Sequence, residues 1–190
     1  MPARWLRAAV LVLASMTLFA CSPQADVPAP TATSETTATT TLPPTPEELA
    51  ADAAMTAFTE LLRVTDAASQ DPGAKDWEPD IRQYAGDPYA FATVEDVRRY
   101  VTLGIRQVGD TEFTAEVASV DLASPQGPTV SLTVCYDSTS ADLIQVDTGE
   151  VIPTGTLPSY VWNVKVIQFE LEPDEPWLVS VVEPLTDQPC

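Results

Sequence analysis

The pattern of apolar residues changes from a helical to an alternating period near the middle of the chain. Apolar residues first recur every three or four positions, which predicts a long helix that stops before Asp71. Its start is marked by Thr45 as the cap, Pro46 in the first turn and Glu48 closing a capping box. The sequence therefore fixes the beginning of the folded part closely.

The same patterns predict the remaining elements. A short helix is expected around 79–84, and a second long helix opens at Thr93. Alternating apolar residues then predict strands near 113–118, 130–137, 143–146, 150–152, 160–171 and 177–182. Asp147-Thr148-Gly149 is the expected hairpin tip between the third and fourth of these. Helices followed by an antiparallel meander indicate the α+β class.

The N-terminus has the pattern of an export signal. Arg4 and Arg7 precede a 13-residue uncharged run, Ala8–Ala20, which is too short for a membrane span. The run ends in Leu18-Phe19-Ala20-Cys21, which resembles the lipobox of bacterial lipoproteins. That resemblance implies a signal peptide over 1–20 and a lipid on Cys21. An ordinary secretory signal cleaved nearby is the alternative.

A linker separates this signal from the folded part. Residues 22–46 contain 8 Thr and 6 Pro but only two large apolar side chains, Val27 and Leu42. Such a segment cannot offset the entropy of ordering by burying apolar surface. We therefore predict a disordered tether over 21–46, counting Cys21, and one folded domain over 47–190.

The charge of the chain excludes several functions. It has 28 Asp and Glu against 9 Lys and Arg, a formal net charge of −19, and no His. A chain without His has no Ser-His-Asp relay and no His-ligated zinc. The negative charge would repel a phosphate backbone, which makes nucleic acid a poor partner.

The order of the predicted elements resembles the nuclear transport factor 2-like superfamily, whose curved sheet wraps the first helix as a cone. The likeness is narrower to secreted, lipid-anchored actinobacterial members. The motifs that carry it are Cys135-Tyr136-Asp137, Asp147-Thr148-Gly149, Trp177-Leu178-Val179 and the final Cys190. The resemblance implies a cone-like domain, and it allows a homodimer through the outer face of the sheet.

The cysteine count agrees with export. If Cys21 carries a lipid, Cys135 and Cys190 remain as a pair. An even pair outside the cytoplasm is expected to form a disulfide. Two buried free thiols are the alternative.

Candidate site residues follow from the enzymes of this superfamily. Members that resemble ketosteroid isomerase use an aspartate base and a tyrosine donor inside the cone. The residues of those types to inspect are Asp121, Asp137, Tyr100 and Tyr136. None of them matches a family motif, and ordinary surface carboxylates and tyrosines at the edge of the core are favoured. Lys165, one of only two lysines, is expected either to pair with a carboxylate or to line a polar pocket.

Two acidic motifs favour ordinary surface structure. Asp147-Thr148-Gly149 is the tripeptide of aspartic proteases, but those enzymes need two copies, and a hairpin turn is favoured. The acidic stretch over 71–87 lacks the spacing of a calcium loop, and a solvated surface is favoured over a metal site. Neither a metal nor another cofactor is predicted.

The favoured function is a lipid-anchored, extracytoplasmic domain that binds a protein or ligand at the cell envelope without catalysis. The alternatives are a cone that binds a small apolar ligand, an isomerase or dehydratase that works without His, and a purely structural envelope component. An open pocket would favour a ligand or an enzyme, and a filled cone would favour interaction or structure.

Overall fold

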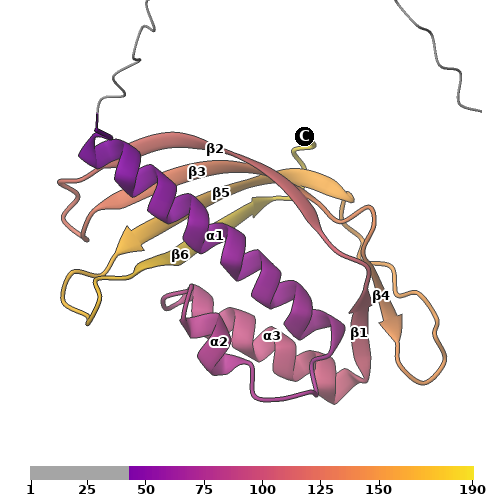
Figure 1. The fold of residues 1–190 in the computed structure, drawn as a ribbon. Coiled ribbons are helices and arrows are strands. Elements are labelled where there is room, and N and C mark those ends of the chain that lie inside the picture. Colours follow the sequence, from indigo (N-terminus) through magenta and orange to yellow (C-terminus); the bar gives the residue numbers. More distant parts are fainter. Residues whose placement is uncertain (1–42) are drawn as a thin grey trace, which may run out of the picture. The chain divides into compact units, whose positions relative to one another are not determined.

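The computed structural model describes residues 43–190. Three helices are followed by six strands (Figure 1). The elements are α1 (Pro46–Gln70), α2 (Glu78–Arg82), α3 (Tyr89–Leu103), β1 (Ile105–Val108), β2 (Glu112–Asp121), β3 (Thr129–Asp137), β4 (Asp142–Gln145), β5 (Ser159–Gln168) and β6 (Trp177–Leu185). The predicted α+β class is confirmed. The predicted signal peptide, Cys21 and the tether as far as residue 42 lie outside the described residues.

The strands form two antiparallel sheets. The larger has the order β2-β3-β5-β6, and the smaller joins β1 to β4. The larger sheet is curved, with the helices on its concave side, and α1 runs across all four of its strands (Figure 1). Both edge strands and the two central strands therefore share one helix as their cover.

The start of α1 has the predicted cap. The Glu48 backbone N–H donates to Thr45 Oγ1 at 3.2 Å, and the Thr45 backbone N–H donates to Glu48 Oε2 at 2.7 Å. These reciprocal bonds satisfy two donors at the beginning of the helix. The helix ends where predicted, with Asp71 as its C-cap and Pro72 immediately after. The sequence therefore determines both ends of α1.

The core lies between α1 and the concave face of the sheet. Phe58 is fully buried and meets the Phe113 ring edge-on at 5.3 Å between centroids. Leu132 on β3 pairs with Val164 on β5, and both are buried. Each fully buried aliphatic side chain of this size contributes about 2 kcal/mol of hydrophobic free energy. The centre of the concave side is thus filled with side chains.

Two predicted boundaries are wrong. The helix α3 begins at Tyr89 rather than Thr93, because Asp87 Oδ1 accepts the Phe91 N–H at 3.2 Å and so supplies a cap four residues earlier. β5 ends at Gln168, and the chain then turns so that Leu171 is fully exposed.

The predicted hairpin around 143–152 is reduced. Its second arm makes a single bridge, Ile144 with Val151, while β4 pairs mainly with the unpredicted strand β1. The turn after β1 allows this pairing because Gly109 has a φ of +88°, and a Cβ there would meet the Ser140 carbonyl oxygen. β1 was not predicted because four residues are too few to show a period.

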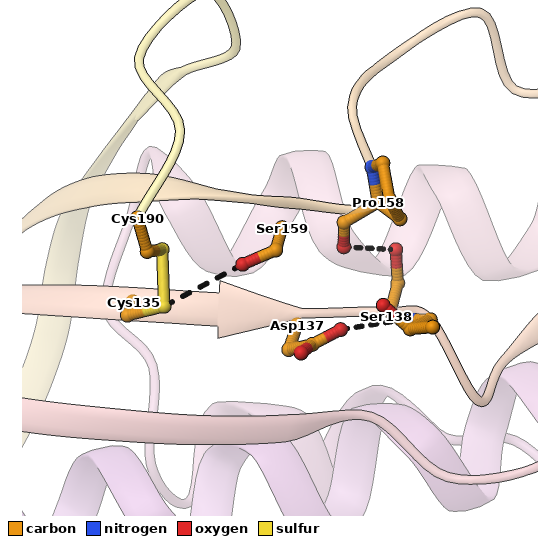
Figure 2. Close-up of a disulfide and its surroundings, with 7 residues drawn as sticks. Cys135, Asp137, Ser138, Pro158, Ser159 and Cys190 are labelled. Carbon is orange, nitrogen blue, oxygen red and sulfur yellow. Dashed lines mark hydrogen bonds between the residues drawn. A yellow bond between two sulfur atoms is a disulfide. The ribbon is translucent and has the colours of Figure 1, made fainter.

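A disulfide joins Cys135 on β3 to Cys190 at the C-terminus, with the Cα atoms 5.7 Å apart (Figure 2). The tail that leads to Cys190 reaches over β5, where the Val161 N–H donates to the Gln188 carbonyl at 3.0 Å. The bond therefore holds the C-terminal tail against the side of the sheet away from the core.

Candidate functional site

A polar cleft of about 480 Å³ opens beside the end of β3. One wall comes from α3 and β1, and the other from the segment that carries β4 and the loop after it. The side chains that give the cleft its chemistry are Tyr100, Gln107, Thr111, Tyr136, Asp142 and Tyr160. Its volume lies within the range of small-molecule sites in proteins.

Three aromatic side chains form the inner end of the cleft region. Tyr136 on β3 and Tyr160 on β5 are cross-strand partners, with ring centroids 5.8 Å apart. Tyr136 also stacks on Trp162 at 4.1 Å, with the ring planes 16° apart. The Trp162 Nε1–H is buried and has no hydrogen-bond partner among the described residues. Stacking on Trp162 restricts the orientation of the Tyr136 ring, whose hydroxyl end is the polar part.

A carboxylate on α1 organises the opposite wall. Asp66 Oδ1 accepts the Gln107 Nε2–H at 2.9 Å. The Thr111 backbone N–H donates to Asp66 Oδ2 at 3.0 Å, and the Thr111 hydroxyl lies 3.0 Å from both carboxylate oxygens. Gln107 Nε2 also donates to the Gly109 carbonyl at 3.0 Å. Asp66 thereby fixes two residues that line the cleft.

The environment keeps the tyrosines of the cleft in their neutral form. Burial raises the pKa of Tyr136, and the negative charge of Asp66 raises it further. Burial also raises the pKa of Tyr100, with the Asp96 carboxylate acting in the same direction. At neutral pH both phenols are hydrogen-bond donors as well as acceptors.

The structure brings only part of the predicted site together. Tyr100 and Tyr136 line the same cleft. Asp137 lies beside it (Figure 2), and its Oδ1 accepts the Thr139 N–H at 2.8 Å. The side chain of Thr139 and this backbone bond together lower the pKa of Asp137. Its carboxylate is therefore used to shape the chain after β3.

Asp121 and Lys165 do not belong to the cleft. Asp121 ends β2, about 30 Å along that strand from its beginning. Lys165 is exposed on the outer face of the sheet. Its cross-strand partners, Ser131 and Val181, are neutral, and no ion pair reaches Lys165 among the described residues. Within the part of the chain that the structure describes, Lys165 therefore neither pairs with a carboxylate nor lines the cleft.

Four cleft residues were missed from the sequence, namely Gln107, Thr111, Asp142 and Tyr160, and so was Asp66 behind them. The sequence pattern could have singled out Asp66, because this residue follows the buried Leu62 by four positions and so lies on the apolar face of the helix. Tyr160 opposes Tyr136 in the register, but the pairing of strands 24 residues apart is not visible in the sequence. Gln107 lies in the strand that was not predicted.

Turn hydrogen bonds and ion pairs explain the two acidic motifs, without a catalytic or metal-binding role for either. In the Asp147-Thr148-Gly149 turn, the Gly149 N–H donates to the Gln145 carbonyl at 2.8 Å, and Gly149 has a φ of +71°. In the acidic stretch, Glu78 pairs with Arg82 and Arg98, and these partners lower the pKa of Glu78. Asp80 pairs with Lys75, and Asp87 pairs with Arg82 as well. No group of three or more potential metal ligands comes together within 43–190.

A second hollow of about 340 Å³ lies between the loop after α1 and α3. Val94, Val97 and Val101 contribute its apolar lining. Its two cations are already paired, Lys75 with Asp80 and Arg98 with Glu78 and Glu95. This hollow therefore offers a ligand little unpaired polarity, in contrast to the cleft.

Comparisons with known proteins do not identify the chain. No protein-family model matches it, and no curated protein sequence matches it. Among solved structures, the intermembrane space region of chloroplast protein ARC6 is similar, with 14% sequence identity over 76% of this chain and 99% of that chain and a TM-score of 0.46. Similarity at this level informs neither family nor function. Within the described residues, no helix is long and apolar enough to cross a bilayer.

Proposed function

We propose that this protein is a lipid-anchored, extracytoplasmic binding protein of the nuclear transport factor 2-like superfamily. A signal peptide over 1–20 is removed, Cys21 carries the lipid, and the tether over 21–46 holds the domain over 47–190 at the cell envelope. The domain binds a ligand and performs no catalysis. A homodimer through the outer face of the sheet stays a prediction.

The N-terminal sequence supports the anchor. The two arginines, the 13-residue apolar run and Cys21 have the order that export and lipidation require. Several acyl chains at one cysteine bind a membrane firmly, because each buried methylene contributes about 0.8 kcal/mol.

The open cleft is the observation that carries the binding function. The core between α1 and the sheet is filled, yet the space beside Tyr136 is not. Hydroxyl and amide groups line it, and only one charged side chain, Asp142, is among the lining residues that the structure describes. A wall of this kind can hold and orient a ligand.

Labelling in cells tests the anchor. The full chain, expressed in a bacterium that processes lipoproteins, should incorporate radiolabelled palmitate and sediment with membranes. The Cys21→Ala variant should incorporate none and lose its membrane fraction, whereas Ser22→Ala should behave as the wild type. Equal fractionation of the Cys21→Ala variant and the wild type would refute the anchor.

A further inference from the structure

The wall of the cleft restricts the chemistry of its ligand. We propose that the cleft binds an uncharged, hydroxyl-rich ring, namely a sugar residue. This inference rests on the proposed binding function and specifies the class of ligand.

The charges around the cleft argue against anionic ligands. No Lys or Arg is among the described residues that line it, and its one charged side chain is the carboxylate of Asp142. A second carboxylate, Asp66, lies directly behind Gln107 and Thr111. A phosphate, sulfate or carboxylate would therefore meet negative charge and find no cationic partner.

The Asp66 contacts turn one wall into a set of acceptors. Both contacts of Gln107 Nε2 are internal, to Asp66 and to the Gly109 carbonyl. Because the amide oxygen points away from the amide nitrogen, Gln107 Oε1 is the atom left to accept from a ligand. The Thr111 hydroxyl donates to Asp66, and its side chain also interacts with Tyr136, so Gln107 Oε1 is the main acceptor that this wall offers. A ligand that matches this wall must donate hydrogen bonds, as sugar hydroxyls do.

The other side of the cleft supplies phenols and aromatic surface. Tyr100, Tyr136 and Tyr160 each offer a hydroxyl and part of a ring. Such rings pack against the C–H groups of a sugar, while the hydroxyls bond to its oxygens. The combination of ring surface, acceptors and neutral donors fits a sugar better than a purely apolar ligand, which would leave these polar groups without partners.

An organic ammonium ion is the competing ligand. Tyrosine rings and the carboxylate of Asp142 would attract a cation. A quaternary ammonium has no N–H to donate to the acceptor wall, whereas a primary ammonium has three. The two ligand classes are therefore separated by comparing neutral sugars with charged probes of both kinds.

Saturation-transfer NMR on the full chain tests the inference. The protein is held in a polyoxyethylene detergent, which carries neither sugar nor ammonium groups. The neutral probes are N-acetylglucosamine, methyl β-glucoside and methyl α-mannoside. The charged probes are glucuronate, glucosamine at pH 6 and choline. We expect transfer to at least one neutral sugar and at least tenfold weaker binding of glucuronate.

Substitutions inside and outside the cleft test whether the sugar binds there. Tyr136→Phe removes one hydroxyl and keeps the ring, and it should weaken sugar binding about fivefold, the loss of one neutral hydrogen bond. Thr154→Val, on the exposed loop that lines the cleft, should weaken it less than Tyr136→Phe does. Tyr84→Phe changes a tyrosine outside the lining and should have no effect.

Three outcomes would overturn the inference: no transfer to any neutral sugar, tighter binding of choline or glucosamine than of the neutral sugars, or binding that Tyr136→Phe leaves unchanged. Palmitate labelling of the same preparation separates the two proposals. A labelled, membrane-bound chain that binds none of the sugars refutes only the proposed class of ligand. An unlabelled chain refutes only the proposed lipid anchor.

Discussion

At the scale of single residues, Asp66 links α1 to the beginning of the sheet. Its carboxylate accepts from Gln107, from the Thr111 backbone and from the Thr111 hydroxyl. These hydrogen bonds are partly buried. Removal of the carboxylate leaves donors without acceptors, which costs more than the bonds themselves contribute.

We therefore expect Asp66→Ala to lower the free energy of unfolding by about 2 kcal/mol. Asp66→Asn should lose less, because one acceptor oxygen remains. The measurement is urea unfolding followed by tryptophan fluorescence. Asp52→Ala, on the exposed side of the same helix, is the control and should change the midpoint little. Equal midpoints for Asp66→Ala and Asp52→Ala would contradict the role given to Asp66.

Tyr136 makes the stability of the domain depend on pH at the alkaline end. Burial and the charge of Asp66 raise the pKa of Tyr136 above that of an unfolded tyrosine. The native state therefore holds this proton at pH values where the unfolded state has released it. The resulting stability is fully present below the unfolded pKa and is lost as pH rises through the higher folded pKa.

In a spectroscopic titration at 295 nm, the native wild type should show several tyrosines that ionise later than the exposed average, because the pKa values of Tyr89, Tyr100 and Tyr136 are all raised. Tyr136→Phe should reduce this late component by one tyrosine and flatten the fall in stability above about pH 10. Tyr84→Phe serves as the comparison and should keep the whole late component. A late component of unchanged size in Tyr136→Phe would show that Tyr136 does not contribute to it.

At the scale of elements, local signals account for what the sequence could predict. The cap at Thr45 and the break at Pro72 are encoded in neighbouring residues, so both ends of α1 follow from them. The start of α3 was placed late because its cap comes from Asp87, outside the usual position, with Pro88 between it and the helix.

Long-range pairing accounts for what was missed. β1 pairs with β4 across more than thirty residues, and the Asp66 contacts join residues 41 and 45 positions apart. The cleft depends on both, so the sequence indicated two of its tyrosines but not their neighbours.

The C-terminal tail is held to the sheet by the Cys135–Cys190 bond and by the hydrogen bond from Val161 to Gln188. The bond closes a loop with a sequence separation of 55. In the chain-entropy model such a loop contributes about 4 kcal/mol, because the crosslink restricts the unfolded chain.

The double variant Cys135→Ser with Cys190→Ser should unfold at a lower urea concentration, with a loss of about 2–4 kcal/mol. Its unfolding should also depend more steeply on urea, since the uncrosslinked chain exposes more surface. Cys21→Ser leaves the bond intact and should match the wild type in both quantities. Identical slopes and midpoints for the double variant would show that the bond does not constrain the unfolded chain.

At the scale of the molecule, the charges are divided unevenly. From Gln107 to the C-terminus the chain has 14 Asp and Glu residues and a single cation, Lys165. In contrast, every ion pair that joins described residues lies within residues 60–99, in the helical part. The sheet and its loops thus carry most of the unpaired negative charge.

This division predicts how stability depends on salt. Exposed like charges on the sheet repel one another over a Debye length of about 20–30 Å at low ionic strength and about 6 Å at 300 mM salt. The melting temperature should therefore rise as sodium chloride is increased from low concentration to 300 mM, and choline chloride should act equally, because screening does not depend on the cation.

Glu116→Gln removes one charge from the sheet and should raise the melting temperature at low salt only. Glu60→Gln removes a carboxylate that pairs with Arg63 and should not raise it. A melting temperature that falls with salt, or a Glu116→Gln effect that persists at 300 mM, would show that repulsion across the sheet does not limit stability.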